Sequence, residues 1–242
     1  MKPLFTLGIT TFNRKELAEE IVKHNIDNCG LERDEYRIIW LDDCSENKPD
    51  LSFLNAEYVI QNNINNGVPK SWNKIYRIFD TEWMVKLPHD CRLSDNWLKI
   101  IKEHIEAIPE SDAFVIPLDL KKKMEEWKDK EIEINGKSVW DEKIIMGVFA
   151  AKRRLFDKVG YLDEEYGYYG FDDADLSFRR LYCKNIKSYF IKNINVEHCW
   201  GEDIPGYNEK KKEWIKKNHP LYVKNCEKVK NKERLFVDNH KI

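Results

Sequence analysis

The sequence predicts an α/β fold with a mixed, mainly parallel sheet. Through the first half of the chain, strand-like apolar segments alternate with segments whose apolar residues have helical spacing. Such alternation is typical of βαβ units with right-handed crossovers. The chain has 242 residues, of which 42% are hydrophobic, and this is enough for a single globular domain around a hydrophobic core.

Five apolar segments of the first half are the predicted strands: residues 4–10, 36–41, 58–60, 82–87 and 113–118. Three segments between them carry apolar residues on one helical face. The first helix is expected to follow Asn13, which forms a capping-box pattern with Glu16. The second is expected to begin near Val68, and the third is expected to have Ser94 as its N-cap.

The second half has a different pattern. An Asn-Gly pair between residues 131–134 and 137–140 predicts a β-hairpin. A helix is expected to begin near Asp172, because acidic residues favour the first turn of a helix. A strand over residues 188–196 then leads to His198.

The end of the chain is basic. Residues 209–234 contain ten Lys and Arg residues against four Glu residues. One interpretation is an arm that binds a membrane surface or nucleic acid. We favour a solvated helix that covers the second half of the domain, because Trp214, Ile215 and Leu221 need a surface on which to pack.

The composition excludes several classes of protein. The 8 Trp, 11 Tyr and 11 Phe residues are incompatible with a disordered chain. A formal net charge of -2 gives no overall attraction to nucleic acid or anionic membranes, and no apolar run approaches the roughly 20 residues of a membrane span. The six cysteines form no CxxC pair, which favours free thiols over disulfides or a zinc site. With no secretory leader in the sequence, the cytoplasm is the expected location.

Polar residues follow three of the predicted strands where each strand ends: residues 10–14, Asp42 with Asp43, and His89 with Asp90. Ligands of open parallel sheets bind beyond the carboxyl ends of the strands. We therefore expect these side chains to converge on one functional edge. Each feature taken singly has a structural alternative, since paired aspartates also cap helices or lie in solvated loops.

Two later features are equally ambiguous when taken alone. Three aspartates within residues 172–175 suit a helix dipole without any catalytic role. A single His198 is more often a structural histidine than a metal ligand.

The order of the motifs is more specific than any one of them. Thr-Thr-Phe-Asn-Arg follows the first strand, Leu-Asp-Asp-Cys-Ser ends the second, and Asn-Asn-Gly precedes a helix; an aspartate follows the fourth strand, then Gly-Phe-Asp-Asp and a late histidine. In this order they resemble family 2 glycosyltransferases of the GT-A fold over about residues 4–200. The resemblance implies a GT-A domain at 1–205, with a nucleotide-sugar-binding half at 1–112 and an acceptor and catalytic half at 113–205, and a basic helical tail at 206–242.

The resemblance also implies roles for individual residues. The implied donor-binding residues are Thr10, Phe12, Arg14, Asp43, Lys70 and His89. Phe12 is expected to stack on the nucleotide base and Asp43 to hydrogen-bond it, with uracil as the expected base. Asp90 matches the last acid of the family's DxD motif and is an implied metal ligand, together with His198. Asp173 matches the catalytic base.

The implied reaction moves a sugar from a UDP-sugar to a hydroxyl group of a glycan, a lipid-linked molecule or another acceptor. Departure of the nucleoside diphosphate builds negative charge, which Mn²⁺ or Mg²⁺ neutralises, and an imidazole ligand favours Mn²⁺. A carboxylate that accepts the proton of the attacking hydroxyl typically increases the reaction rate by about 10²–10⁴-fold. One base and one displaced diphosphate imply a single displacement with inversion.

The sequence departs from the family pattern at three places, the mildest of which is Asp172 in place of the usual Glu. The DxD motif has become Pro88-His89-Asp90, so its first acid is absent and His89 is a candidate substitute, and Trp72 replaces an expected arginine. The alternative is therefore a degenerate module that binds a sugar nucleotide without turnover. A sugar-nucleotide pyrophosphorylase is disfavoured, because the loop after the first strand is not glycine-rich. The basic tail leaves modified DNA open as a less favoured acceptor.

Overall fold

The computed structural model describes residues 2–141, 144–199 and 206–238. Its strands are β1 (Phe5–Thr11), β2 (Tyr36–Asp42), β3 (Tyr58–Gln61), β4 (Trp83–Pro88), β5 (Cys91–Leu93), β6 (Ala113–Ile116), β7 (Glu131–Ile134), β8 (Lys137–Asp141), β9 (Val148–Lys152), β10 (Ser188–Ile191) and β11 (Val196–His198). Its α-helices are α1 (Lys15–Asp27), α2 (Gly67–Ile78), α3 (Trp97–Ala107), α4 (Leu120–Glu126), α5 (Arg153–Val159), α6 (Asp172–Tyr182) and α7 (Tyr207–Lys230). Short 3₁₀ turns are η1 (Arg33–Glu35), η2 (Ser52–Leu54), η3 (Lys128–Lys130) and η4 (Glu164–Tyr166).

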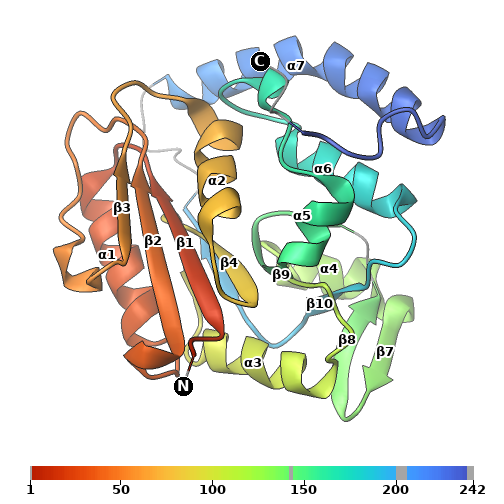
Figure 1. The fold of residues 1–242 in the computed structure, drawn as a ribbon, viewed down its shortest axis with the longest axis horizontal. Coiled ribbons are helices and arrows are strands. Elements are labelled where there is room, and N and C mark those ends of the chain that lie inside the picture. Colours follow the sequence, from red (N-terminus) through yellow and green to blue (C-terminus); the bar gives the residue numbers. More distant parts are fainter. Residues whose placement is uncertain (1, 142–143, 200–205, 239–242) are drawn as a thin grey trace.

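A nine-stranded sheet with the order β3-β2-β1-β4-β9-β6-β10-β8-β7 forms the centre of the molecule (Figure 1). The strands β9 and β8 run opposite to the other strands of this sheet. The predicted α/β fold with a mixed, mainly parallel sheet is therefore confirmed. The predicted hairpin is also present as β7 and β8, and it extends the sheet at the edge opposite β3.

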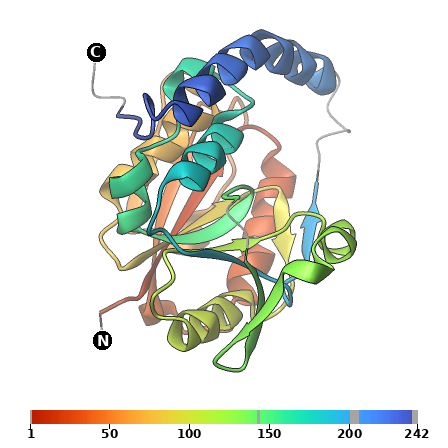
Figure 2. The ribbon, with the colours of Figure 1, turned by 90° about the vertical axis from the view of Figure 1, so that its right-hand side faces the viewer.

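The two faces of the sheet each bury an apolar layer. The helices α1 and α3 cover one face of the sheet, and α2, α5 and α6 cover the other (Figure 2). Phe5 and Leu7 of β1 belong to the first apolar layer, and Ile39 of β2 belongs to the second. Neighbouring strand residues contribute to opposite layers because side chains alternate along a strand. Burial of each large apolar side chain contributes about 1.5–3 kcal/mol, so the sheet is a rigid platform for the loops at its ends.

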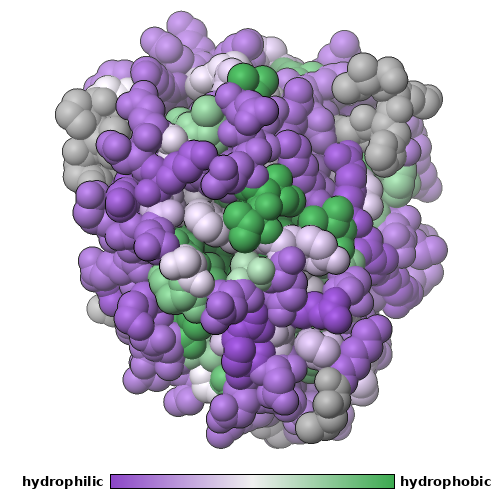
Figure 3. All heavy atoms as spheres, turned by 60° about the vertical axis from the view of Figure 1, so that its left-hand side comes forward, coloured by the Kyte–Doolittle hydropathy of each residue, from purple (hydrophilic) through white to green (hydrophobic). Residues whose placement is uncertain are grey.

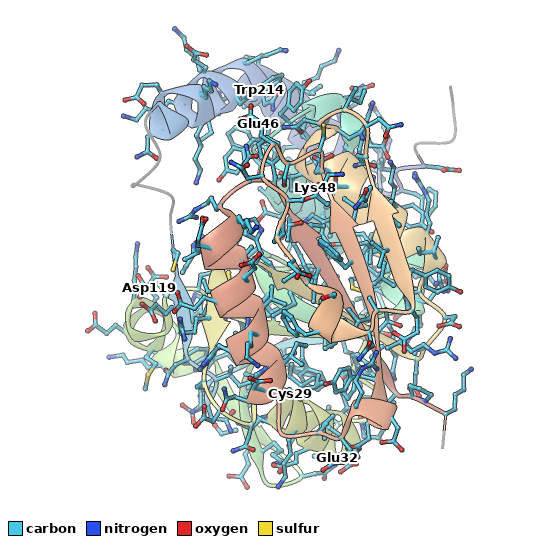
Figure 4. All side chains as sticks on the ribbon, turned by 90° about the vertical axis from the view of Figure 1, so that its left-hand side faces the viewer. Cys29, Glu32, Glu46, Lys48, Asp119 and Trp214 are labelled. Carbon is cyan, nitrogen blue, oxygen red and sulfur yellow. The ribbon has the colours of Figure 1, made fainter. Side chains whose placement is uncertain are left out.

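The helix α7 confirms the predicted helical tail. It lies at the end of the molecule where the parallel strands finish (Figures 1 and 2). In Figure 4, Trp214 of α7 and Glu46 of the loop after β2 lie at this end, opposite Cys29 and Glu32. The amide of Asn218 anchors the helix by donating to the carbonyl groups of Tyr166 at 2.6 Å and Tyr169 at 2.9 Å. Of the proposed tail, residues 239–242 lie outside the described part of the chain, as do residue 205 at the domain boundary and residues 200–204 before it.

The segment after α7 returns to the second half of the domain. The N–H of Tyr161 donates to the carbonyl of Val237 at 3.0 Å. Arg234 pairs with Asp163 and, at 2.7 Å, with Asp175 of α6. Asp175 also pairs with Arg179 at 2.8 Å. This buried network holds the start of α6 against the chain's C-terminal segment.

Two predicted helix caps are wrong. The residue that precedes α1 is Arg14, with no side-chain cap, and Asn13 instead uses its side-chain oxygen to accept from the N–H of Glu46 at 3.0 Å. The residue that precedes α3 is Asn96, whereas the hydroxyl of Ser94 accepts from the N–H of Asn195 at 3.1 Å. In both cases a contact with a distant loop replaces the local capping bond.

The predicted strand over residues 188–196 is divided. Its first part is β10 in the main sheet, and its end belongs to β11, which pairs with β5 in a separate two-stranded sheet. All six cysteines are free, as the composition indicated. Within the described ranges, no helix is both long and apolar enough to cross a bilayer. Hydrophilic residues dominate the face that Figure 3 shows.

Candidate active site

The loop after β1 is fixed by contacts with two other loops. Asn13 and Arg14 both have left-handed backbone conformations, with φ of 53° and 51°. The N–H of Asn13 donates to the Ser45 hydroxyl at 2.7 Å, and the guanidinium of Arg14 donates to the carbonyl of Cys199 at 2.8 Å. Such backbone strain persists only where surrounding contacts hold it. The loop leaves the ring of Phe12 40% exposed.

Asp43 organises the connection between β3 and α2. Its carboxylate is buried and accepts from the side chain of Asn62 at 2.7 Å and from the N–H groups of Asn66 at 2.9 Å and Gly67 at 3.0 Å. A carboxylate offers about four acceptor positions, so one position remains for a ligand. The N–H of Asp43 donates to the carbonyl of Thr11 at 2.8 Å, which places this acid beside the loop after β1.

Asp90 and His198 meet across the small sheet. The register of β5 and β11 places Cys91 opposite His198, and Asp90 lies in the turn immediately before β5. The distance between Asp90 Oδ2 and His198 Nε2 is 3.4 Å. Burial raises the pKa of Asp90, but the hydrogen bond with His198 and the charges of His89 and His198 outweigh burial and lower the pKa to about 2.

The donor set fits a hard divalent cation. Adjacent ligands of an octahedral ion with bonds of about 2.1 Å lie about 3 Å apart, close to the observed separation of Asp90 and His198. The group also contains Cys91, whose thiol donates to Asp90 Oδ1 at 3.7 Å. Burial and the charge of Asp90 raise the pKa of Cys91 well above its usual value. Since thiolates rather than thiols bind metals, the carboxylate and the imidazole are the suitable ligands.

His89 links the ends of β1 and β4. Its Nδ1 donates to the carbonyl of Thr10 at 2.8 Å. Its Nε2 is buried and has no hydrogen-bond partner among the described residues. When the ring is neutral, with Nδ1 as the donor, Nε2 carries the lone pair and can accept a hydrogen bond at the edge of the sheet.

The first turn of α6 carries the acidic run. Asp172 is buried, and burial together with the adjacent charge of Asp173 raises its pKa to about 7. Asp173 is half-buried. Asp175 is enclosed by its pairs with Arg179 and Arg234, so Asp172 and Asp173 are the acids of this turn that are suited to chemistry.

The contacts described above bring several predicted residues to one edge of the sheet. They are Thr10, Phe12 and Arg14 of the loop after β1, together with Asp43, His89, Asp90 and His198. Lys70 is placed differently. It is exposed on α2 and lines a surface pocket with Asp163, Glu164 and Arg234.

Two lysines near the site were not predicted. Lys86 is buried in β4, and its signal in the sequence is a charge inside an otherwise apolar segment. The Nζ atom of Lys211 in α7 lies 4.7 Å from the ring centroid of Tyr169. Burial lowers the pKa of Lys211, and the charge of Asp90 opposes this shift.

Comparison with known proteins identifies the family. The profile of glycosyl transferase family 2 matches residues 6–176. The chain belongs to glycosyl transferase family 2. The match begins in β1, ends within α6 and includes the strand ends described above, with the exception of β11. No curated protein sequence matches this family 2 chain.

Solved structures similar to this glycosyltransferase share its GT-A fold at low identity. Mannosyltransferase PcManGT from Pyrobaculum calidifontis, in complex with GDP-Man and Mn2+, has a TM-score of 0.59 at 17% identity over 78% of this chain. GalNAc-T7 with UDP, GalNAc and Mn2+ has a TM-score of 0.63 at 14% identity over 81% of this chain. S. aureus TarS 1-349 in complex with UDP-GlcNAc has a TM-score of 0.53 at 15% identity over 77% of this chain. The matched regions span 54%, 44% and 57% of those chains.

Proposed function

We propose that this family 2 glycosyltransferase moves a sugar from a UDP-sugar to an acceptor hydroxyl, with a divalent metal and with inversion at the anomeric carbon. The observation that carries the proposal is the 3.4 Å approach of Asp90 and His198 at the edge of the sheet. Three structural relatives that contain GDP-Man, UDP or UDP-GlcNAc support a nucleotide-sugar donor, and two of the three contain a uridine nucleotide.

The donor-binding residues act by shape and hydrogen bonding. Phe12 offers an exposed ring on which a base can stack, and Asp43 has one acceptor position left for the base. His89 accepts from a ribose hydroxyl through Nε2. Arg14 fixes the loop that carries Phe12 and Thr10, whereas Lys70 lines a different pocket with Asp163 and Arg234 and is left out of the donor-binding set.

Asp90 and His198 would hold Mn²⁺ or Mg²⁺, which supplies neutralisation of the charge that develops on the departing diphosphate. The negative charge of Asp90 at neutral pH follows from its lowered pKa. The ammonium of Lys211, whose charge interacts with that of Asp90, attracts the diphosphate.

Asp173 is the proposed general base. Its carboxylate accepts the proton of the acceptor hydroxyl while that oxygen attacks the anomeric carbon, and the bond from this carbon to the diphosphate breaks on the opposite face. The acceptor is a glycan, a lipid-linked molecule or another hydroxyl compound, with modified DNA less favoured. The cytoplasm remains the expected location.

The test is donor hydrolysis with a panel of UDP-, GDP- and dTDP-sugars, with and without Mn²⁺, in which released nucleotide is measured. Slow, Mn²⁺-dependent release from one UDP-sugar is the expected result, and it identifies the donor. The proposal is contradicted if no nucleotide is released from any donor and calorimetry detects no nucleotide binding.

A degenerate module that binds a sugar nucleotide without turnover is the second candidate, because Pro88 occupies the place of the first acid of the DxD motif. Calorimetry separates the two functions. Binding of a UDP-sugar without release in the presence of suitable acceptors, and unaffected by Asp173→Asn, supports the binding module.

A further inference from the structure

The residue that precedes α6 has a backbone conformation that its side chain disfavours. Phe171 has a φ of 69° and a ψ of -3°, which lie in the left-handed region. Asn and Asp tolerate this region because their short polar side chains hydrogen-bond locally, but a bulky aromatic residue has no such compensation. Strain of this kind persists only where surrounding contacts hold it, and it is concentrated at functional sites. The contacts that hold Phe171 are therefore candidates for a functional role.

These contacts come from α7, which lies beside α6 (Figures 1 and 2). The ring of Phe171 stacks on the ring of Tyr222, with centroids 4.7 Å apart and an angle of 20° between the planes. The centroid of the His219 ring lies 5.8 Å from that of Phe171. Since residues three apart are neighbours on a helix surface, one side of α7 provides both contacts.

The rest of the loop before α6 is attached to the same helix. A Cβ at Gly170 would lie 3.4 Å from Ile215, and Asn218 donates to the carbonyl groups of Tyr166 and Tyr169. The match to the family profile ends at residue 176. The helix that holds this loop is therefore an element that the chain has outside the matched region.

The attachment determines where the first turn of α6 begins. The carbonyl of Phe171 accepts from the N–H of Asp175 at 2.8 Å, which is the first hydrogen bond of the helix. Asp173 lies in the turn that this bond closes. A change in the backbone dihedral angles of Phe171 would therefore move the carboxylate of Asp173.

We propose that Tyr222 is a positioning residue, which holds Phe171 in its left-handed conformation and thereby sets the place of the Asp173 carboxylate. The catalytic part of this inference rests on the proposed function, because it requires Asp173 to be the base. A displacement of about 1 Å at a reacting group can lower a rate by about 100-fold. Loss of the stack is therefore expected to impair sugar transfer and to leave donor binding intact.

The first experiment needs no activity. Hydrogen–deuterium exchange is followed by NMR at the amides of Asp175 and Leu176 in the wild type and in Tyr222→Leu. We expect exchange to be about 10-fold faster in the variant, because the first turn of α6 opens more readily without the stack. Tyr222→Phe keeps the ring, and we expect it to restore slow exchange.

A matched control is Tyr182→Leu. Tyr182 forms a ring pair with Phe178 near the other end of α6, with centroids 5.2 Å apart, so this substitution is expected to leave exchange at Asp175 unchanged. If Tyr222→Leu does not fold, Phe171→Leu, which removes the other ring of the stack, is measured in its place. Exchange at the wild-type rate in the variant without the stack overturns the proposal.

The second experiment uses activity with the donor identified by hydrolysis. Tyr222→Leu is expected to lower kcat for sugar transfer by about 10- to 100-fold and to leave KM for the donor unchanged, and Tyr222→Phe is expected to restore kcat. An unchanged kcat in Tyr222→Leu overturns the inference. If no sugar nucleotide is hydrolysed, the proposed function fails, while the exchange measurement still decides whether Tyr222 holds the start of α6.

A comparison of Phe171→Ala with Phe171→Gly separates positioning from stability. Both variants lack the ring, but glycine adopts the left-handed conformation without strain. We therefore expect a higher urea midpoint for Phe171→Gly than for Phe171→Ala, with kcat equally low in both. If kcat recovers together with the urea midpoint in Phe171→Gly, the stack has a merely structural role and the inference is overturned.

Discussion

Asp43 and Tyr168 hold consecutive N–H groups at the start of the same helix. The carboxylate of Asp43 accepts from Gly67 at 3.0 Å, and the carbonyl of Tyr168 accepts from Val68 at 3.0 Å. Gly67 has a φ of +79°, and a Cβ there would lie 2.5 Å from the Cα of Tyr168. The first turn of α2 therefore connects Asp43, which is proposed to bind the nucleotide base, to the loop that leads into α6.

Substitution of Asp43 by Asn is expected to destabilise this connection. The substituted side chain presents an NH₂ group to N–H donors that now have a carboxylate, so we expect a loss of about 1–3 kcal/mol in the free energy of unfolding. We also expect weaker nucleotide binding by calorimetry. The exposed Asp50, replaced in the same way, is the control, and equal effects of the two substitutions would contradict the assignment.

Replacement of His198 by Gln is expected to reduce Mn²⁺-dependent donor hydrolysis by about 100-fold or more, because loss of a ligand removes several kcal/mol of charge stabilisation. The measurement is a Mn²⁺ titration of nucleotide release. The exposed His219 of α7 provides the control, since His219→Gln leaves the pair intact. A wild-type Mn²⁺ response in the His198 variant would exclude this histidine as a ligand.

Asp173→Asn is expected to lower kcat for sugar transfer by about 10²–10⁴-fold, as for loss of a general base. KM for the donor is expected to change little, because Asp173 acts on the acceptor. The exposed Asp157, changed to Asn, controls for loss of an aspartate nearby. Full transfer by the Asp173 variant would assign the base elsewhere.

The stability of the protein is expected to fall with rising pH through Asp172. Its pKa rises from the ordinary 3.8 to about 7 on folding. Between these pH values the folded protein holds a proton that the unfolded chain has released, so the cost of burying Asp172 is absent below about pH 4, grows as the pH rises, and is fully present above about pH 7, where the buried carboxylate is ionised. Relative to the wild type, Asp172→Asn is expected to gain about 2–4 kcal/mol between about pH 4 and pH 8 in urea unfolding. A difference that does not vary with pH would refute this.

Lys211→Met is expected to weaken the binding of UDP with Mn²⁺ by about 3- to 10-fold, the effect of one partly screened charge. The effect should shrink as salt is added. The neighbouring Lys212 is exposed, so Lys212→Met serves as the control in the same calorimetric titration. Equal affinities of the two variants would show that Lys211 does not face the diphosphate.

Much of the fold follows from local pattern. The predicted strands of the first half agree with β1, β2, β3, β4 and β6 to within two residues, because buried strands require apolar runs. The three-residue strands β5 and β11 are too short to have a pattern, and their pairing depends on the assembled molecule. The wrong cap at Asn13 has the same origin, since the contacts of Asn13 with Ser45 and Glu46 exist only after folding.

The site was predictable to a different degree. Motif order indicated Asp43, Asp90 and His198 as candidates. Convergence of parallel strand ends accounts for the places of Asp43 and Asp90, whereas His198 comes from the antiparallel pair of β5 and β11. No local pattern indicates that Lys211 is partly buried whereas Lys212 is exposed, since the docking of α7 on the domain decides which lysine turns inward.

The buried pairs of Arg234 have a consequence for synthesis of the protein. Asp175, which Arg234 secures, leaves the ribosome 59 residues earlier in the chain. A nascent chain that ends before Arg234 and Val237 can complete the sheet but lacks the contacts that hold the start of α6. The main sheet is thus complete during translation, whereas α6 is secured only after the C-terminal segment has been made.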